Sequence, residues 1–266
     1  MIQTLDSHLQ RSTGAIVFEL GADGEVRRVR EEGCAKLRMP ARLPGQSLEA
    51  IIINTAGGLA GGDRFEVDAS ADGGSDGCLT TQAAEKVYRS LGGETCLATR
   101  LHVHGTARLL WLPQETLLFD GSRLNRSFEA DLDHRATLLA VETIVLGRKA
   151  MGETLTDFSF HDSWRIRRDG RLILADELRL DAARVAGRAA LAGHLAFAMI
   201  VLVRSEVESL AEPLREIIGA NGGVSAWDGK LVARLTAMDS FSLRKALIPA
   251  LTLLAAPTEL PKVWTC

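Results

Sequence analysis

Six Asp-Gly pairs are spread along the 266-residue chain, and the runs between them partly alternate apolar and polar residues. Both residue types tolerate the positive φ angles of tight hairpin turns, so such pairs favour antiparallel strands. AIVFEL and EVRRVR flank the first pair, which predicts a hairpin over residues 15–30. Similar runs continue, so we predict consecutive antiparallel strands over 10–190, packed as a large β-sandwich or a coiled β structure. The pairs lie at residues 23–24, 72–73, 76–77, 120–121, 169–170 and 228–229.

The pattern changes from residue 194 onward. HLAFAMIVLV predicts a buried strand, and residues 207–223 carry apolar side chains at helical spacing before Asn-Gly, which predicts a helix. VSAWDGKLVARLT predicts a hairpin around its Asp-Gly pair, and DSFSLRKALIPALTLLA predicts a second helix. Asp239 or Ser240 is the expected N-cap of that helix, and Pro249 should kink it or end its regular part.

The predicted fold class is therefore mainly β, with two α-helices near the C-terminus. Residues 80–90 (TTQAAEKVYRS) have a helix-like composition, but the neighbouring segments favour strand. We therefore predict a strand there. No linker rich in Pro, Gly and Ser divides the chain. We therefore expect a single domain over 1–266, with a β-rich body at 10–193 and a strand-helix-hairpin-helix part at 194–266.

Composition argues against several classes of function. The net charge of −3 gives no basic balance for nucleic-acid binding. The opening residues lack the apolar core of a signal peptide, and the longest apolar runs, at 195–203 and 247–256, are too short to span a bilayer. The four cysteines form no CxxC pair, which predicts a reduced, cytoplasmic protein without a structural zinc site.

A glycine-rich loop, NTAGGLAGGDRFEV, follows the apolar run AIII. A phosphate-binding P-loop needs a Lys and a hydroxyl after its last glycine, whereas Asp63 stands there in this chain. A dinucleotide fingerprint needs a helix directly after the glycines, whereas RFEVDAS alternates like a strand. The loop is therefore predicted to be a tight turn between strands, with close backbone packing.

Two shorter patterns have weaker functional interpretations. GGSDG at 73–77 matches the G-x-S-x-G string of serine hydrolases, which would make Ser75 a nucleophile, but the preceding run VDASAD is too polar for the buried strand that this motif needs, and alternating β–α units are absent. We interpret it as an acidic turn. His102 and His104 lie two apart on a predicted strand and should share a face. Such a pair can bind a transition metal, but it is more often simply polar surface.

The acid at position 142 lies inside the apolar run LLAVETIVLG, where an unpaired carboxylate would be costly to bury. Two interpretations are open. Glu142 forms an internal ion pair with Arg148 or Lys149, or it lines a wet internal path. Upstream, Pro113 should interrupt regular pairing and leave Gln114 and Glu115 at a bend.

Five blocks of sequence, taken in order, resemble one family. NTAGGLAGGDRF, LTTQAAEKVYRS, WLPQETLLFD, VETIVLGRKAMGE and LPKVW together are similar to the urease accessory protein UreD family, also called UreH. The resemblance runs from about residue 50 to the C-terminus. It implies a mainly β, helically coiled fold with two helices, and a protein that is not an enzyme.

The resemblance also implies partners and cargo. UreD-like proteins form a cytoplasmic complex with the helical protein UreF and the GTPase UreG, which docks on apo-urease and installs nickel. No cofactor is held tightly, Ni²⁺ passes transiently through an internal water-filled passage, and neither nucleic acid nor membrane is involved. The rival hypotheses are a β-rich protein-binding module without a metal role and, from the G-x-S-x-G string, a serine hydrolase.

Residues in the matching blocks are candidates for these roles. As transient nickel contacts near the passage, the resemblance suggests the acids Asp63, Glu115, Glu142 and Glu153. The structural or partner-binding candidates are Gly57, Gly58, Gly61, Gly62, Thr81, Gln82, Lys86, Tyr88 and Arg89.

Overall fold

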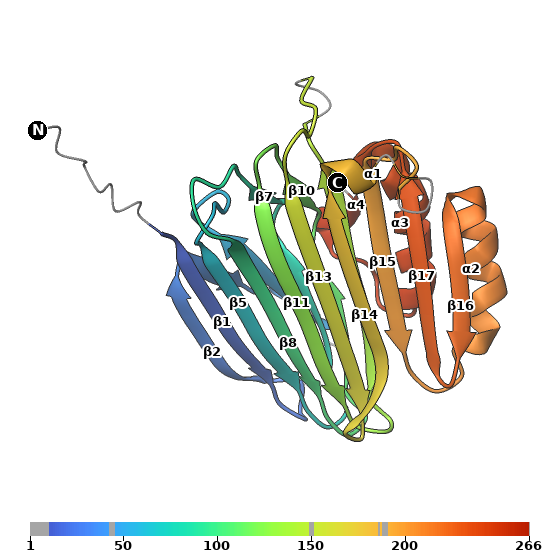
Figure 1. Ribbon diagram of the computed structural model, residues 1–266. Coiled ribbons are helices and arrows are strands. Elements are labelled where there is room, and N and C mark those ends of the chain that lie inside the picture. The colour runs from blue at the N-terminus through green and yellow to red at the C-terminus, as the bar shows by residue number, and fades with distance from the viewer. Residues whose placement is uncertain (1–10, 43–45, 149–151, 186, 188–190, 266) are drawn as a thin grey trace, which may run out of the picture.

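A computed structural model describes residues 11–42, 46–148, 152–185, 187 and 191–265. Over these residues the chain forms two large β-sheets with an apolar core between them, and helices cover part of the second sheet (Figure 1). The strand order is β14-β13-β11-β8-β5-β1-β2 in the first sheet and β16-β17-β15-β12-β9-β6-β4-β3 in the second. The mainly β, coiled fold with helices near the C-terminus is thus confirmed.

The elements have the following bounds. The first sheet contains β1 (Thr13–Leu20), β2 (Val26–Gly33), β5 (Arg64–Ala71), β8 (Thr95–Val103), β11 (Arg123–Leu132), β13 (Ser159–Arg168) and β14 (Arg171–Asp181). The second contains β3 (Ala35–Arg38), β4 (Leu48–Asn54), β6 (Asp76–Thr81), β9 (Arg108–Leu112), β12 (Thr137–Leu146), β15 (Ala196–Val203), β16 (Gly222–Trp227) and β17 (Lys230–Ala237). Of two further short strands, β10 (Thr116–Leu118) pairs with β12, and β7 (Glu85–Val87) pairs with β10. The α-helices are α1 (Ala182–Val185), α2 (Ala211–Ile218), α3 (Ser240–Ala255) and α4 (Lys262–Thr265).

The body of the protein is a coil in which the chain passes back and forth between the sheets. From β4 to β13 the long strands fall alternately in the second and the first sheet, and from β5 onward each pairs in parallel with the strand of the preceding turn. The expectation of consecutive antiparallel strands is therefore wrong for the body. Alternation identifies a strand with one buried face, but it is the same for a strand that folds back and for one that crosses to the facing sheet.

The Asp-Gly pairs show this difference directly. Those at 23–24, 169–170 and 228–229 form the expected hairpins β1–β2, β13–β14 and β16–β17. Those at 72–73 and 120–121 instead connect strands of different sheets, and the pair at 76–77 lies within β6. A turn signal predicts a change of direction but not the sheet that receives the next strand.

Period-two burial holds the two sheets together. Strand β11 buries every second side chain, and β1 and β5 do the same, so that one face of each strand points into the space between the sheets. Phe18, Trp111, Phe128 and Trp164 belong to that shared core. Burial of this apolar surface is the main driving force for closing the two sheets on each other.

The C-terminal part extends the second sheet and carries the helices. All eight residues of β15 are buried, because Met199 and Val201 face the core between the sheets while Ile200 and Leu202 face the helices. Both long C-terminal helices are confirmed, and in Figure 1 α2 lies behind β16. The carboxylate of Asp239 caps α3 by accepting from the Ser242 N–H.

Two smaller expectations can be compared with the structure. Helix α3 contains Pro249 and continues to Ala255, so the proline does not end it. The segment at 80–90 is strand at both ends, in β6 and β7, with a bend at 82–84 between them. Within the described residues, no helix is long and apolar enough to cross a membrane.

Candidate functional site

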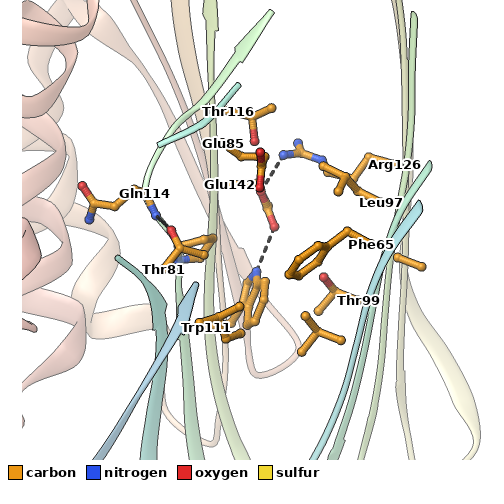
Figure 2. A pocket seen from close by; sticks show the side chains of 14 residues that line it. Phe65, Thr81, Glu85, Leu97, Thr99, Trp111, Gln114, Thr116, Arg126 and Glu142 are labelled. Atoms are coloured by element: carbon orange, nitrogen blue, oxygen red, sulfur yellow. Dashed lines mark hydrogen bonds and ion pairs between the residues drawn. The ribbon is translucent and has the colours of Figure 1, made fainter. Parts of the chain in front are cut away.

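A cavity of about 60 Å³ lies between the two sheets (Figure 2). It lies beside the short strands β7 and β10, which contribute Glu85 and Thr116 to its lining. Its lining combines apolar side chains, such as Phe65 and Leu97, with Thr81, Thr99, Glu142 and Arg126. A buried water needs roughly 10–15 Å³ and two to four polar partners, so the cavity has room and hydrogen-bonding groups for a few waters.

Arg126 and Glu142 form the ionic part of this cavity, together with Asp162. The Nη1 atom of Arg126 lies 2.5 Å from Glu142 Oε2, and its Nε and Nη2 atoms lie 2.9 and 2.8 Å from the two oxygens of Asp162. All three side chains are less than a tenth exposed. One buried cation is therefore shared by two carboxylates, a geometry in which charge-assisted hydrogen bonds are strong.

Two tryptophans hold the carboxylates in place. The indole N–H of Trp111 donates to Glu142 Oε1 at 2.8 Å, and that of Trp164 donates to Asp162 Oδ2 at 3.1 Å. Figure 2 shows Trp111 and Arg126 meeting Glu142 from different sides. Each carboxylate thus has an arginine partner and an indole partner, and its orientation is restricted by both.

The strand pattern explains how these charges come to be buried. Arg126 occupies an inward position of β11, between Leu124 and Phe128, and lies in register with Asp162 on β13. Glu142 belongs to β12 in the facing sheet. An unpaired carboxylate would be costly to bury in this core, because desolvating a single charge costs far more than its hydrogen bonds return.

The protonation equilibria reflect this balance. Burial raises the pKa of Glu142 above its ordinary value, while the nearby Arg126 guanidinium and the Trp111 N–H act in the opposite direction. For Arg126, burial alone would lower the pKa, but the flanking carboxylates outweigh it and raise the pKa. The guanidinium is therefore a permanent positive charge in the cavity wall.

A second hollow, of about 130 Å³, adjoins the cavity toward the protein surface. The two share Ile52, Phe65, Thr81 and Glu85 in their walls. Glu85 is half-buried; it accepts from the Asn54 amide at 3.0 and 3.1 Å, and burial raises its pKa. The shared wall makes Thr81 and Glu85 the polar groups between the outer hollow and the ionic cavity.

The glycine-rich loop forms part of the outer hollow. Gly57 and Gly58 line it together with Gln82 and Lys86. The Leu59 N–H donates to the Lys86 carbonyl, and the Tyr88 N–H donates to the Leu59 carbonyl, both at 2.7 Å. The predicted tight turn with close backbone packing is thus observed, and the surface approached is the β7 segment.

The structure separates the four predicted acids. Only Glu142 lines the cavity between the sheets. Asp63 is buried and accepts from the backbone N–H groups of Ser12 and Ala60, both at 2.8 Å, so it closes the glycine-rich loop. Glu115 is buried against Arg244 of α3 at 2.8 Å. Glu153 pairs with Arg148 at 3.1 Å in a different, open hollow at the surface.

The structural and partner candidates fall into three groups. Gly57, Gly58, Thr81, Gln82 and Lys86 line the outer hollow, as described above. Near the separate surface hollow, Tyr88 packs its ring against Phe119, Arg89 pairs with Asp120 at 2.5 Å, and both line that hollow with Glu153. Gly61 and Gly62 lie in the bend before Asp63, where the Gly62 N–H donates to the Glu94 carbonyl at 3.0 Å.

The proposed ion pair of Glu142 exists, but its partner is not the one expected. Arg148 pairs with Glu153 instead, Lys149 lies outside the described residues, and the cation at Glu142 is Arg126. The ion pair does not exclude the second interpretation, since the paired Glu142 also lines the cavity.

Sequence reasoning missed Arg126, Asp162 and Glu85. A signal was present for the first two, because the alternation in RLNRSFEADL and SFHDSWRIRR places a charged residue at an inward position of each strand. A charge at an inward position calls for a partner on a neighbouring or facing strand. Glu85 had no comparable signal, because β7 is only three residues long.

The serine-hydrolase interpretation finds no support in the geometry. Ser75 lies in the turn between β5 and β6, and its buried Oγ has no hydrogen-bond partner, so no base lies within hydrogen-bonding reach of it. His102 and His104 do share an exposed face, where their rings are nearly parallel with centroids 6.4 Å apart. The described residues contain no group of three or more His, Cys, Asp or Glu that could hold a metal.

Ser75→Ala is therefore expected to leave the fold intact and to change stability by no more than about 1 kcal/mol, because the hydroxyl makes no hydrogen bond that could be lost. Thermal melting checks the stability. Ester hydrolysis measured on both proteins checks the chemistry, and turnover present in the wild type but absent in the variant would restore the hydrolase interpretation.

These features define a class of protein: a two-sheet β-coil that encloses a small ionic cavity, with helices covering one of its sheets. Comparison with known proteins names the family. The sequence model of the family described as "UreD urease accessory protein" matches residues 12–265, and the chain belongs to that family.

Several relatives named "Urease accessory protein UreD" are similar over almost their whole length. The protein of Rhizobium leguminosarum bv. viciae is 49% identical over 243 residues, which cover 90% of this chain and 89% of the relative. That of Agrobacterium fabrum (strain C58) is 48% identical, covering 88% and 83%. That of Brucella suis is 44% identical, covering 98% and 97%.

Proposed function

We propose that this protein is a urease accessory protein that assists urease maturation without being a catalyst itself. It forms a cytoplasmic complex with a UreF-like protein and a UreG-like GTPase, and this complex docks on apo-urease. Family membership over residues 12–265 supports the role in maturation. The glycine-rich loop packs on β7 and ends at the buried Asp63 instead of the Lys of a P-loop. This is consistent with a complex in which the GTPase, and not this protein, binds the nucleotide.

Within that complex, the cavity between the sheets is proposed to be a section of the path taken by Ni²⁺, the cargo. The observation that carries this proposal is the position of Glu142, which lines a cavity large enough for water and is buried at the same time. The adjoining outer hollow, reached past Thr81 and Glu85, extends the polar lining toward the surface.

The donor groups suit passage better than storage. Carboxylate and hydroxyl oxygens bind Ni²⁺ more weakly than clusters of imidazole and thiolate, which would hold the ion. Among the described residues, the cavity lining includes Glu142, Glu85 and threonines, and no His or Cys. A cation can therefore exchange water for a protein oxygen and then leave again.

Two variants form a matched test, because Glu142 and Asp162 share the same arginine but only Glu142 lines the cavity. Both Glu142→Gln and Asp162→Asn remove one carboxylate and keep an oxygen that can accept from the indole. We expect Glu142→Gln to lower the nickel content of urease severalfold, and Asp162→Asn to lower it much less. Urease matured with each variant, its partner proteins and limiting Ni²⁺ is purified for metal analysis.

Complex formation is measured in parallel by co-purification with the UreF-like and UreG-like partners, and both variants should assemble as the wild type does. Equal nickel contents with Glu142→Gln and with the wild type would contradict the passage. If the wild-type protein bound neither partner and failed to raise urease activity, the accessory role would be wrong and a binding module without a metal role would remain.

A further inference from the structure

Glu142 and Asp162 surround a single position from two sides, and the guanidinium of Arg126 occupies it. Asp162 takes the Nε and Nη2 edge of the guanidinium, and Glu142 takes Nη1. Each carboxylate is also held by an indole N–H, from Trp111 or Trp164. The arrangement is a preorganised cation site in which the cation is attached to the chain.

Without the arginine, this donor set would suit a hard divalent ion. Two carboxylates fixed in a buried site, each oriented by an outer hydrogen-bond donor, are ligands that divalent cations bind well. The adjoining cavity, of about 60 Å³, could supply waters to complete the coordination. A passage that contained such a pair of free carboxylates would retain its cargo.

Arg126 also controls which carboxylate the cavity reaches. Arg126 and Glu142 both line the cavity, whereas Asp162 is not part of its lining. Asp162 is buried behind the guanidinium and bound to it through both oxygens. Of the two carboxylates bound to Arg126, an ion in the cavity can therefore meet only Glu142, which is already paired with a positive charge.

We propose that Arg126 is a resident cation that prevents Glu142 and Asp162 from trapping a divalent ion, so that the passage offers one weakened carboxylate instead of a two-carboxylate site. This inference rests on the proposed nickel passage for its biological sense. The guanidinium suits the task, because it cannot lose its charge by deprotonation and its planar fork spans both partners. Arg126 is thus a positioning residue that acts through Glu142.

The test asks whether removing the arginine creates a metal site. The full-length chain carrying Arg126→Gln is stripped of metal and melted with and without Ni²⁺. We expect the variant to melt well below the wild type without metal. Ni²⁺ at about 100 times its Kd should raise the melting temperature by roughly 5–10 °C. About one Ni²⁺ per chain should remain after desalting, whereas the wild type should retain none beyond weak surface binding.

Two controls isolate the carboxylate pair. Arg126→Gln/Glu142→Gln/Asp162→Asn keeps similar shapes but has no carboxylates, and it should lose the response to Ni²⁺. Arg108→Gln removes another partly buried arginine, whose ion-pair partner is the single carboxylate of Asp76, and should show no response. Subtracting the wild-type shift accounts for Ni²⁺ bound at surface histidines such as His102 and His104.

A melting temperature of Arg126→Gln that does not respond to Ni²⁺ beyond the wild-type shift would overturn the proposal. If that variant does not fold without metal, Ni²⁺ should restore its folded structure, and failure of Ni²⁺ to do so also overturns the proposal. Arg126→Lys keeps the positive charge and should show no rise beyond the wild-type shift. The result is independent of the passage, because Glu142→Gln tests nickel content in urease whereas these variants test binding to the isolated chain.

Discussion

Arg126→Met is expected to lower the free energy of unfolding by about 3–5 kcal/mol, because it leaves two buried carboxylates without their cation. Glu142 and Asp162 have no other cationic partner within salt-bridge distance among the described residues. Methionine fills similar volume, so the loss would come from charge and hydrogen bonding more than from a cavity. Chemical denaturation in metal-free buffer measures it, and the corresponding fall in melting temperature is roughly 6–20 °C.

A compensating variant provides the control. Adding Glu142→Gln and Asp162→Asn to Arg126→Met removes the uncompensated charges but keeps oxygens for the two indoles, and should recover most of the lost stability. The loss should also shrink at lower pH. The pKa of Glu142 is raised in the native state. At pH values above the ordinary pKa of a glutamate, the native state therefore binds more protons than the unfolded state does. The free energy of unfolding consequently falls as the pH rises through the raised pKa. A pH-independent loss, unchanged in the triple variant, would indicate poor packing instead.

Gly58→Ala is expected to disrupt the glycine-rich loop, with a cost of about 1–3 kcal/mol from backbone conformation alone. Gly58 has φ of +148°, and a Cβ atom there would lie 2.3 Å from the Tyr88 ring and 2.9 Å from the Lys86 carbonyl oxygen. The ring could move, but the carbonyl belongs to the backbone that holds the loop against β7. Thermal melting should show the loss, and hydrogen exchange should show lower protection of the Leu59 and Tyr88 amides.

Gly57→Ala in the same loop is the matched comparison. Gly57 also has positive φ, at +75°, but a Cβ atom there would meet nothing within 4 Å. Its cost should stay near the roughly 1–2 kcal/mol of a left-handed backbone, with the Leu59 and Tyr88 amides still protected. Equal effects of the two substitutions would mean that the close approach of the loop to β7 contributes nothing.

Local chemistry predicted the elements of this fold well and their connections less well. The hairpins at 23–24, 169–170 and 228–229, the buried strand β15 and the helices α2 and α3 follow from turn residues and periodicity, which depend on neighbours in sequence. The parallel pairing of β5, β8 and β11 does not follow, because strands of successive turns are far apart in sequence.

The candidate site divides in the same way. The inward charges Arg126 and Asp162 can be recognised on their own strands from alternation, and Glu142 from its apolar run. That they share one cluster depends on the register of β11 with β13 and on the approach of β12 from the facing sheet. The sequence suggested Arg148 for Glu142 because it is near in the chain, whereas the structure pairs Glu142 with a residue on the opposite sheet.

From the residues alone it follows that this chain is mainly β, has helices near its C-terminus, lacks a P-loop and resembles the UreD family. Each of these follows from periodicity, turn chemistry or ordered motifs that are written along the chain. Which charges meet, and which of them line a cavity, depends on the way the coil stacks its turns. Coulomb and hydrogen-bond energies depend on distance in space, and the stacking brings one arginine between two carboxylates of different strands.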